Sequence, residues 1–75
     1  MLAHKLLAQS ITNLKSNRSV ALVETDSDYV IAKGYRGADD CWEQGYYFPK
    51  AVDNAYSDAV TEYKQAVLND IEQTL

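Results

Sequence analysis

The chain has 75 residues, of which 47% are hydrophobic, and a formal net charge of −4. This length predicts a single domain over residues 1–75, near the smallest size that one core stabilises without a metal or disulfides. The hydrophobic content excludes a disordered chain, and the single cysteine, Cys41, excludes an internal disulfide or a Cys-based zinc site. No apolar run is long enough for a membrane span or a secretory signal, so we expect a cytoplasmic protein without a membrane partner.

Residues 2–15 predict a first helix. Leu2, Leu6 and Leu14 fall on one half of the helical wheel, with polar side chains opposite. A polar turn at residues 16–18 follows. This segment is expected to cover one face of the sheet that comes next.

The middle of the chain predicts three strands. Residues 20–23 are apolar and partly β-branched, and the run is too short for a helix. Short polar residues after it favour a turn, so the first two strands form a hairpin. The expected strands lie at residues 19–24, 29–35 and 41–48. The first of them is apolar on both faces, which indicates that something besides the helices covers it.

Residues 49–74 predict one long amphipathic helix. Its apolar residues recur at spacings of three and four, and Pro49 suits the first helical turn. At ~1.5 Å per residue the helix spans about 39 Å, well beyond a six-residue strand of about 20 Å. The excess length indicates a partner or a second copy of the chain.

The expected fold is therefore α+β with the element order α-β-β-β-α. A three-stranded antiparallel meander packs against a short N-terminal helix and a long C-terminal helix. Asp70 falls within the apolar stripe of the long helix, which predicts that beyond Val67 the helix leaves the core, frays or meets another chain. The residues expected to contact a second copy are Val67, Asp70 and Ile71.

Charge is divided unevenly along the chain. Residues 1–23 contain no acid, whereas residues 24–75 carry all eleven Asp and Glu residues. Two interpretations stay open. A basic first helix lies beside an acidic second one, or an acidic face steers the protein toward a basic partner surface.

The aromatic residues also have two interpretations. One Trp, one Phe and six Tyr make up 11% of the chain, and Tyr56 and Tyr63 fall on the stripe that should face the core. Tyr35 and Tyr47 are the tyrosines expected outside. Exposed Tyr beside acidic residues is typical of binding surfaces, because Tyr offers contact area at a low cost in entropy.

No motif indicates catalysis, a metal or a cofactor. His4 and Cys41 are single residues without an orienting third group, and the acidic turns lack the spacing of an EF-hand loop. Residues 33–37 resemble only the start of the RNA-recognition-motif signature, and the acidic balance disfavours nucleic acid. We expect no enzymatic activity, no cofactor and no nucleic-acid partner.

In size, charge and element order the chain resembles small, acidic, Tyr-rich proteins encoded by phages, including anti-CRISPR and other host-takeover inhibitors. That resemblance implies a protein that acts by occupying a site on a host protein. The leading hypothesis is a non-enzymatic inhibitor or adaptor that binds a basic partner surface. The alternative is a self-associating structural or regulatory subunit that dimerises through its C-terminal helix. The expected partner-binding residues are Asp26, Asp28, Tyr35, Asp39, Asp40, Glu43, Tyr47, Asp58 and Glu62.

Overall fold

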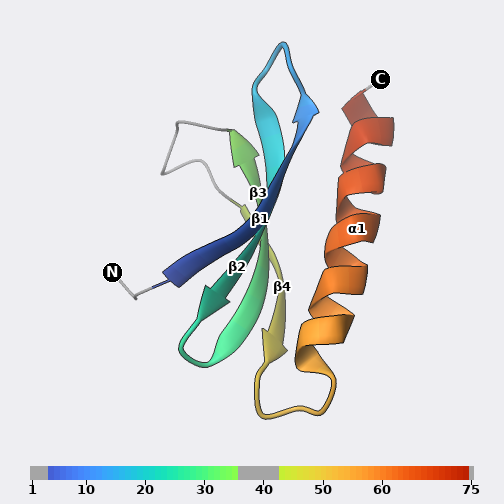
Figure 1. Ribbon diagram of the computed structural model, residues 1–75. Coiled ribbons are helices and arrows are strands. Elements are labelled where there is room, and N and C mark those ends of the chain that lie inside the picture. The colour runs from blue at the N-terminus through green and yellow to red at the C-terminus, as the bar shows by residue number, and fades with distance from the viewer. Residues whose placement is uncertain (1–3, 36–42, 75) are drawn as a thin grey trace.

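The computed structural model describes residues 4–35 and 43–74, with side chains described over 5–34 and 46–73. Four strands are followed by one helix, in the order β1 (His4–Asn13), β2 (Arg18–Thr25), β3 (Asp28–Tyr35), β4 (Glu43–Pro49) and α1 (Ala55–Thr74). The strands form one antiparallel sheet in which each pairs with its neighbour in sequence, and α1 packs across one face of that sheet (Figure 1). The α+β class and the antiparallel meander are confirmed.

The predicted N-terminal helix is wrong, because residues 4–13 form strand β1. The sequence of this segment fits both periods. Its leucines gather on one side of a helical wheel. The small residues Ala8, Ser10 and Thr12 occur at every second position, so in a strand they share one face. Pairing with β2, with Gln9 opposite Ala21, satisfies the backbone groups along one edge of the segment and decides between the two. The sheet therefore has four strands in place of the expected three.

The C-terminal helix is shorter than predicted. It begins at Ala55, because Pro49 ends β4 and residues 50–54 form a connecting loop. A helix of 20 residues spans about 30 Å, close to the ~26 Å of an eight-residue strand. The length of α1 therefore matches the sheet, and the argument for a partner from excess helix length fails.

The core lies between α1 and the sheet. Small side chains on α1, Ala59 and Ala66, are almost fully buried, which lets the helix approach the strands closely. Val20 and Leu22 of β2 and Ile31 of β3 complete the buried cluster. Residues that pack against this cluster and are partly buried are Leu7, Ala8, Tyr29, Phe48, Val60, Tyr63 and Val67.

The sheet face turned away from α1 is also largely shielded. Ala21 pairs with Ala32, and Val23 pairs with Val30, so these four side chains point away from the helix. Ala21, Val30 and Ala32 are all less than 10% exposed within the single chain. The doubly apolar strand therefore does not require a partner, contrary to the expectation from the sequence.

Candidate functional site

The β2–β3 turn and the β4–α1 loop meet at one end of the molecule (Figure 1). Asp28 N donates to Thr25 Oγ1 at 3.0 Å and closes the turn that carries Asp26. Lys50 N donates to the carbonyl oxygen of Ser27 at 2.9 Å and joins the loop to this turn. Two segments far apart in sequence are thereby held side by side.

The loop turns the chain from β4 into α1 over five residues. Val52 N donates to Pro49 O at 3.0 Å, and Ala55 N donates to Val52 O at 3.2 Å. Asn54 has φ 65°, a left-handed conformation that Asn tolerates better than most residues, and its carbonyl accepts the first helical bond. This geometry places Tyr56 in the first turn of α1, where its side chain is 55% exposed.

Two tyrosines form the wall of a shallow, open hollow of about 440 Å³ at this end. The Tyr29 and Tyr56 rings lie edge to face with centroids 5.4 Å apart, and Lys50 Nζ lies 5.4 Å from the Tyr29 centroid. Ring contacts of this kind fix the orientation of both tyrosines. The hollow is lined by Tyr29, Lys50, Val52, Asp53, Asn54, Ala55, Tyr56 and Ser57.

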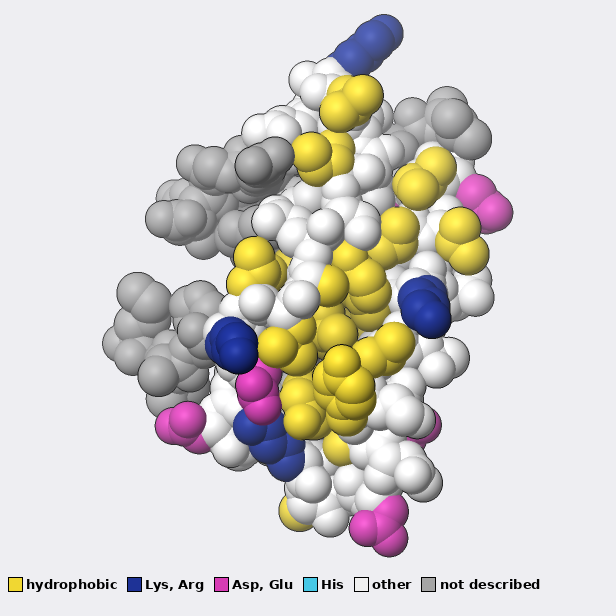
Figure 2. Space-filling model, in the orientation of Figure 1, with side chains coloured by type: hydrophobic (Ala, Val, Ile, Leu, Met, Phe, Trp, Pro, Cys, Tyr) yellow, Lys and Arg dark blue, Asp and Glu magenta, His cyan; other side chains and the backbone are white. Residues whose placement is uncertain are grey.

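Lys50 is the basic residue of this hollow, and its charge is engaged. Lys50 Nζ lies 2.9 Å from Glu24 Oε2, and this hydrogen-bonded pairing raises the pKa of Lys50 above its ordinary value despite partial desolvation. Lys50 and Glu24 cancel each other's charge, whereas Asp26, Asp53 and Asp58 are exposed, so the described residues at this end are negative in balance. Asp and Glu side chains stand around the lower part of the molecule in Figure 2.

Four of the predicted partner-binding residues are described with their side chains near this end or along α1. Asp26 is exposed in the turn, and Asp28 is half-buried at the start of β3. Asp58 is exposed in the first turn of α1, and Glu62 lies one turn further along.

Of the remaining predicted residues, only Tyr47 has a described side chain, and it lies on another face of the molecule. Tyr47 is 53% exposed on β4 and stands opposite Val30, on the sheet face turned away from α1. Asp39 and Asp40 lie outside the described residues. Tyr35 and Glu43 belong to β3 and β4, but their side chains lie outside the described set.

The sequence interpretation missed Asp53, Val52 and Tyr56 as surface residues. Val52 and Tyr56 fit the apolar stripe of a helix that starts at Pro49, yet both are more than half exposed. A helix that starts after Asn54 shifts Val52 into the loop. Asn is a favoured residue just before a helix, so Asp53 and Asn54 were the signal for that later start.

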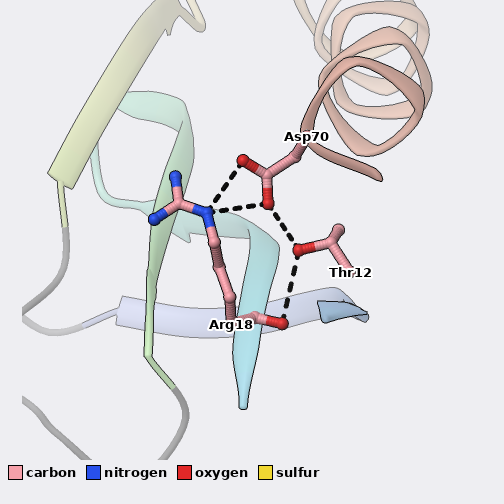
Figure 3. A network of polar contacts seen from close by, with 3 residues as sticks. All are labelled: Thr12, Arg18 and Asp70. Atoms are coloured by element: carbon pink, nitrogen blue, oxygen red, sulfur yellow. Dashed lines mark hydrogen bonds and ion pairs between the residues drawn. The ribbon is translucent and has the colours of Figure 1, made fainter. Parts of the chain in front are cut away.

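A second polar group ties the last turns of α1 to the β1–β2 hairpin (Figure 3). Arg18 Nε lies 2.9 Å from both Asp70 Oδ1 and Asp70 Oδ2, and Thr12 Oγ1 donates to Asp70 Oδ2. Thr12 Oγ1 also lies 3.3 Å from the Arg18 carbonyl oxygen. Asp70 is 1% exposed.

Burial by itself raises the pKa of Asp70, but the opposing effects are together larger. The hydrogen bonds from Thr12 and Arg18, with the positive charges of Arg18 and Lys33, hold the pKa below its ordinary value. Asp70 is therefore a buried, ionised anchor of the fold.

The expectation that α1 leaves the core beyond Val67 is therefore wrong. Val67 packs against the core, and Asp70 is buried within the chain where a second copy does not reach it. Asp70 is tolerated in the apolar stripe because the side chain of Arg18, from β2, forms an ion pair with it. Ile71 is half-buried.

No family model matches the chain, and no curated protein or solved structure gives a significant match. Among residues 4–35 and 43–74 no group of three or more His, Cys, Asp or Glu side chains is placed to hold a metal ion. Within the same ranges, no helix has the length and apolar character needed to cross a membrane.

Proposed function

We propose that the protein is a small, non-enzymatic inhibitor or adaptor that works in the cytoplasm by binding a basic surface of another protein. The binding surface is the acidic end, defined here as Asp26, Asp28, Asp53 and Asp58 together with the hollow between Tyr29 and Tyr56. As with the phage-encoded inhibitors that the sequence resembles in build, the protein acts by occupancy.

The single observation that carries this proposal is the exposed Tyr56 ring beside carboxylates whose neighbouring lysine is already paired. An exposed tyrosine offers a face for an arginine or lysine side chain, and nearby carboxylates accept the hydrogen bonds of its charged head. Aromatic anchors within a polar rim are the usual centre of a protein interface.

Lys50 supports the same choice of partner. Because Glu24 already holds its ammonium group and cancels its charge, the carboxylates of the acidic end outnumber the basic groups that an incoming cation meets there. An acidic partner would instead have to displace Glu24 from Lys50. The arrangement favours a basic partner over an acidic one at this end.

The test is capture from a lysate of the native host with the wild-type protein and two matched variants. Tyr56→Ala should lose the specific partner, because it removes the exposed ring at the hollow. Tyr47→Ala removes an equally exposed tyrosine on the opposite face and should keep the partner. A partner retained by Tyr56→Ala, or one that binds through an acidic surface, contradicts the proposal.

The alternative is self-association through the C-terminal half of α1. Leu68 is 55% exposed there, and Val67 and Ile71 are only partly buried. These three residues replace the earlier set, since Asp70 is buried. A dimer in sedimentation equilibrium that Leu68→Asp dissociates would favour this alternative over the acidic end.

A further inference from the structure

The ammonium group of Lys50 lies against two groups that each attract a cation. Lys50 Nζ is 2.9 Å from Glu24 Oε2 and 5.4 Å from the centroid of the Tyr29 ring. These distances are those of an ion pair and of a cation–π contact. A carboxylate beside an aromatic face suits any positively charged side chain, so Lys50 shows where such a group sits on this surface.

Positive charge is favoured at this position. Glu24 contributes most to raising the pKa of Lys50 above its ordinary value, against partial desolvation, and the charge of Asp26 acts in the same direction. Lys5 also stands opposite Glu24 in the strand register. The lysine that lies over Tyr29 and lines the hollow, however, is Lys50.

The side chain of Lys50 can leave this position without unfolding the loop. The side chains of Lys50 and Glu24 are each 33% exposed, so water reaches the ion pair. The backbone of Lys50 is held separately, because its N–H donates to the carbonyl oxygen of Ser27 at 2.9 Å. Exposed ion pairs contribute little to stability. Exchange of the ammonium group for another cation therefore costs the fold little.

A second aromatic ring stands beside the first. The planes of the Tyr29 and Tyr56 rings meet at 65°, with the centroids 5.4 Å apart, so the two rings form a corner. Tyr56 is 55% exposed, and Asp53 lines the same hollow. A flat cation placed against Tyr29 thus has the neighbouring ring and a further carboxylate within the same hollow.

We propose that Tyr29 and Glu24 form a cation site that Lys50 occupies in the free protein, and that an arginine of the basic partner replaces Lys50 there in the complex. This inference rests on the function proposed above and names the side chain that the acidic end recognises. The displaced ammonium group returns to water, where Lys50 is already exposed. Lys50 is thereby an internal competitor that sets a threshold for binding.

Arginine passes this threshold where lysine does not. A lysine of the partner offers the same ammonium group as Lys50, and Lys50 has the advantage of being tethered beside the site, which gives it a high effective concentration. A guanidinium group adds what an ammonium group lacks. It donates two parallel N–H groups to one carboxylate and stacks flat on an aromatic ring. The site therefore selects arginine over lysine.

The probes are N-acetyl-arginine amide and N-acetyl-lysine amide, each titrated into the isolated protein and followed in NMR spectra of its amides and tyrosine rings. For the wild type we expect the Kd of the arginine probe to be lower by about tenfold than that of the lysine probe. The shifts should centre on Tyr29 and Tyr56, and the side-chain signals of Lys50 should change as its contact with Glu24 is lost.

Two variants with the same change in net charge separate this site from general electrostatics. Lys50→Gln removes the internal competitor, so both probes should bind several-fold more tightly, and the lysine probe should gain more than the arginine probe. Lys5→Gln removes the lysine opposite Glu24 on β1 and should leave both Kd values nearly unchanged. Glu24→Gln should remove the preference for arginine, because the amide no longer accepts two N–H groups.

Four results would overturn the proposal. They are no binding of the arginine probe, equal affinity of the wild type for the two probes, unchanged Kd values in Lys50→Gln, and shifts that leave both tyrosine rings unaffected. If one of them occurs while Tyr56→Ala still loses the partner from the lysate, the acidic end binds its partner without exchange at Lys50. If Tyr56→Ala keeps the partner, the function proposed for that end fails, and the titrations of the isolated protein still decide whether the cation site exists.

Discussion

Ser10 Oγ and Tyr63 Oη lie 2.6 Å apart and join the middle of β1 to the middle of α1. The bond closes a loop of more than fifty residues, from the edge strand of the sheet to the centre of the last helix. Tyr63 thereby packs its ring on the core and satisfies its hydroxyl in the same position.

Tyr63→Phe should lower the free energy of unfolding by about 1 kcal/mol, because the ring stays while one partly buried hydrogen bond is lost. Urea unfolding followed by circular dichroism measures the change. Tyr56→Phe is the control, since the Tyr56 side chain is more than half exposed, and it should leave the midpoint unchanged. Equal effects of the two variants would show that the Ser10 bond adds no stability.

Asp70→Asn should destabilise the fold by about 3 kcal/mol, the lower part of the range for breaking a buried ion pair, because Arg18 keeps partial access to water. Thermal unfolding at neutral pH measures the loss. Asn69→Ala, at the neighbouring exposed position, is the control and should change stability by less than about 0.5 kcal/mol.

Acid should weaken the wild-type fold through the same residue. The pKa of Asp70 is lower in the folded chain than in the unfolded chain, so its contribution is fully present above the unfolded pKa of about 3.9. The contribution is lost as the pH falls through the folded pKa. Unfolding free energies over a pH series should therefore drop less steeply below about pH 4 in Asp70→Asn than in the wild type. Parallel curves would contradict an ionised Asp70.

Ala59→Asp should unfold the domain. Ala59 is fully buried against the sheet, and an unpaired carboxylate there costs several kcal/mol against a total stability of about 5–10 kcal/mol. Leu68→Asp places the same carboxylate on the exposed side of α1 and should remain folded. Circular dichroism and amide NMR spectra of the two variants provide the comparison.

Charge at the acidic end should govern how fast a basic partner associates. Reversing Asp26 and Asp53 to Lys should slow association by roughly tenfold at low salt and flatten its salt dependence, because steering acts over a Debye length of ~8 Å. Stopped-flow kinetics with the captured partner measures both effects. If neither salt nor the double reversal changes the association rate, these acidic residues do not steer a partner and serve only to solvate the surface.

The two strands of the central hairpin were predictable from the sequence. β2 and β3 lie within one residue of their expected bounds at each end, because β-branched residues and a short polar turn define the hairpin. The C-terminal helix was predictable in kind, but its start was placed too early. A proline such as Pro49 is as common in the first turn of a helix as it is acceptable at the end of an edge strand, so the residue does not decide between the two.

β1 was not predictable from its own residues. Leucine, alanine, glutamine and lysine favour a helix by propensity, and only pairing with β2 selects the strand. The same limit applies to Asp70. A carboxylate in an apolar stripe is interpretable only once Arg18, more than fifty residues away, is known to face it. The hollow was not predictable either, because Tyr29 and Tyr56 meet only when β3 and α1 are placed together.

The C-terminal half of β1 meets α1 through polar side chains, Ser10 with Tyr63 and Thr12 with Asp70. β1 adds only the partly buried Leu7 and Ala8 to the apolar cluster, whereas β2 and β3 supply its buried residues Val20, Leu22 and Ile31. β1 should therefore be the first strand to detach in native-state fluctuations. Its amide protons should exchange with deuterium well before those of β2 and β3, which open only with the whole domain. The outermost strand is thus a separable layer of the fold, attached through its pairing with β2, two small contacts on the core and two hydroxyl groups.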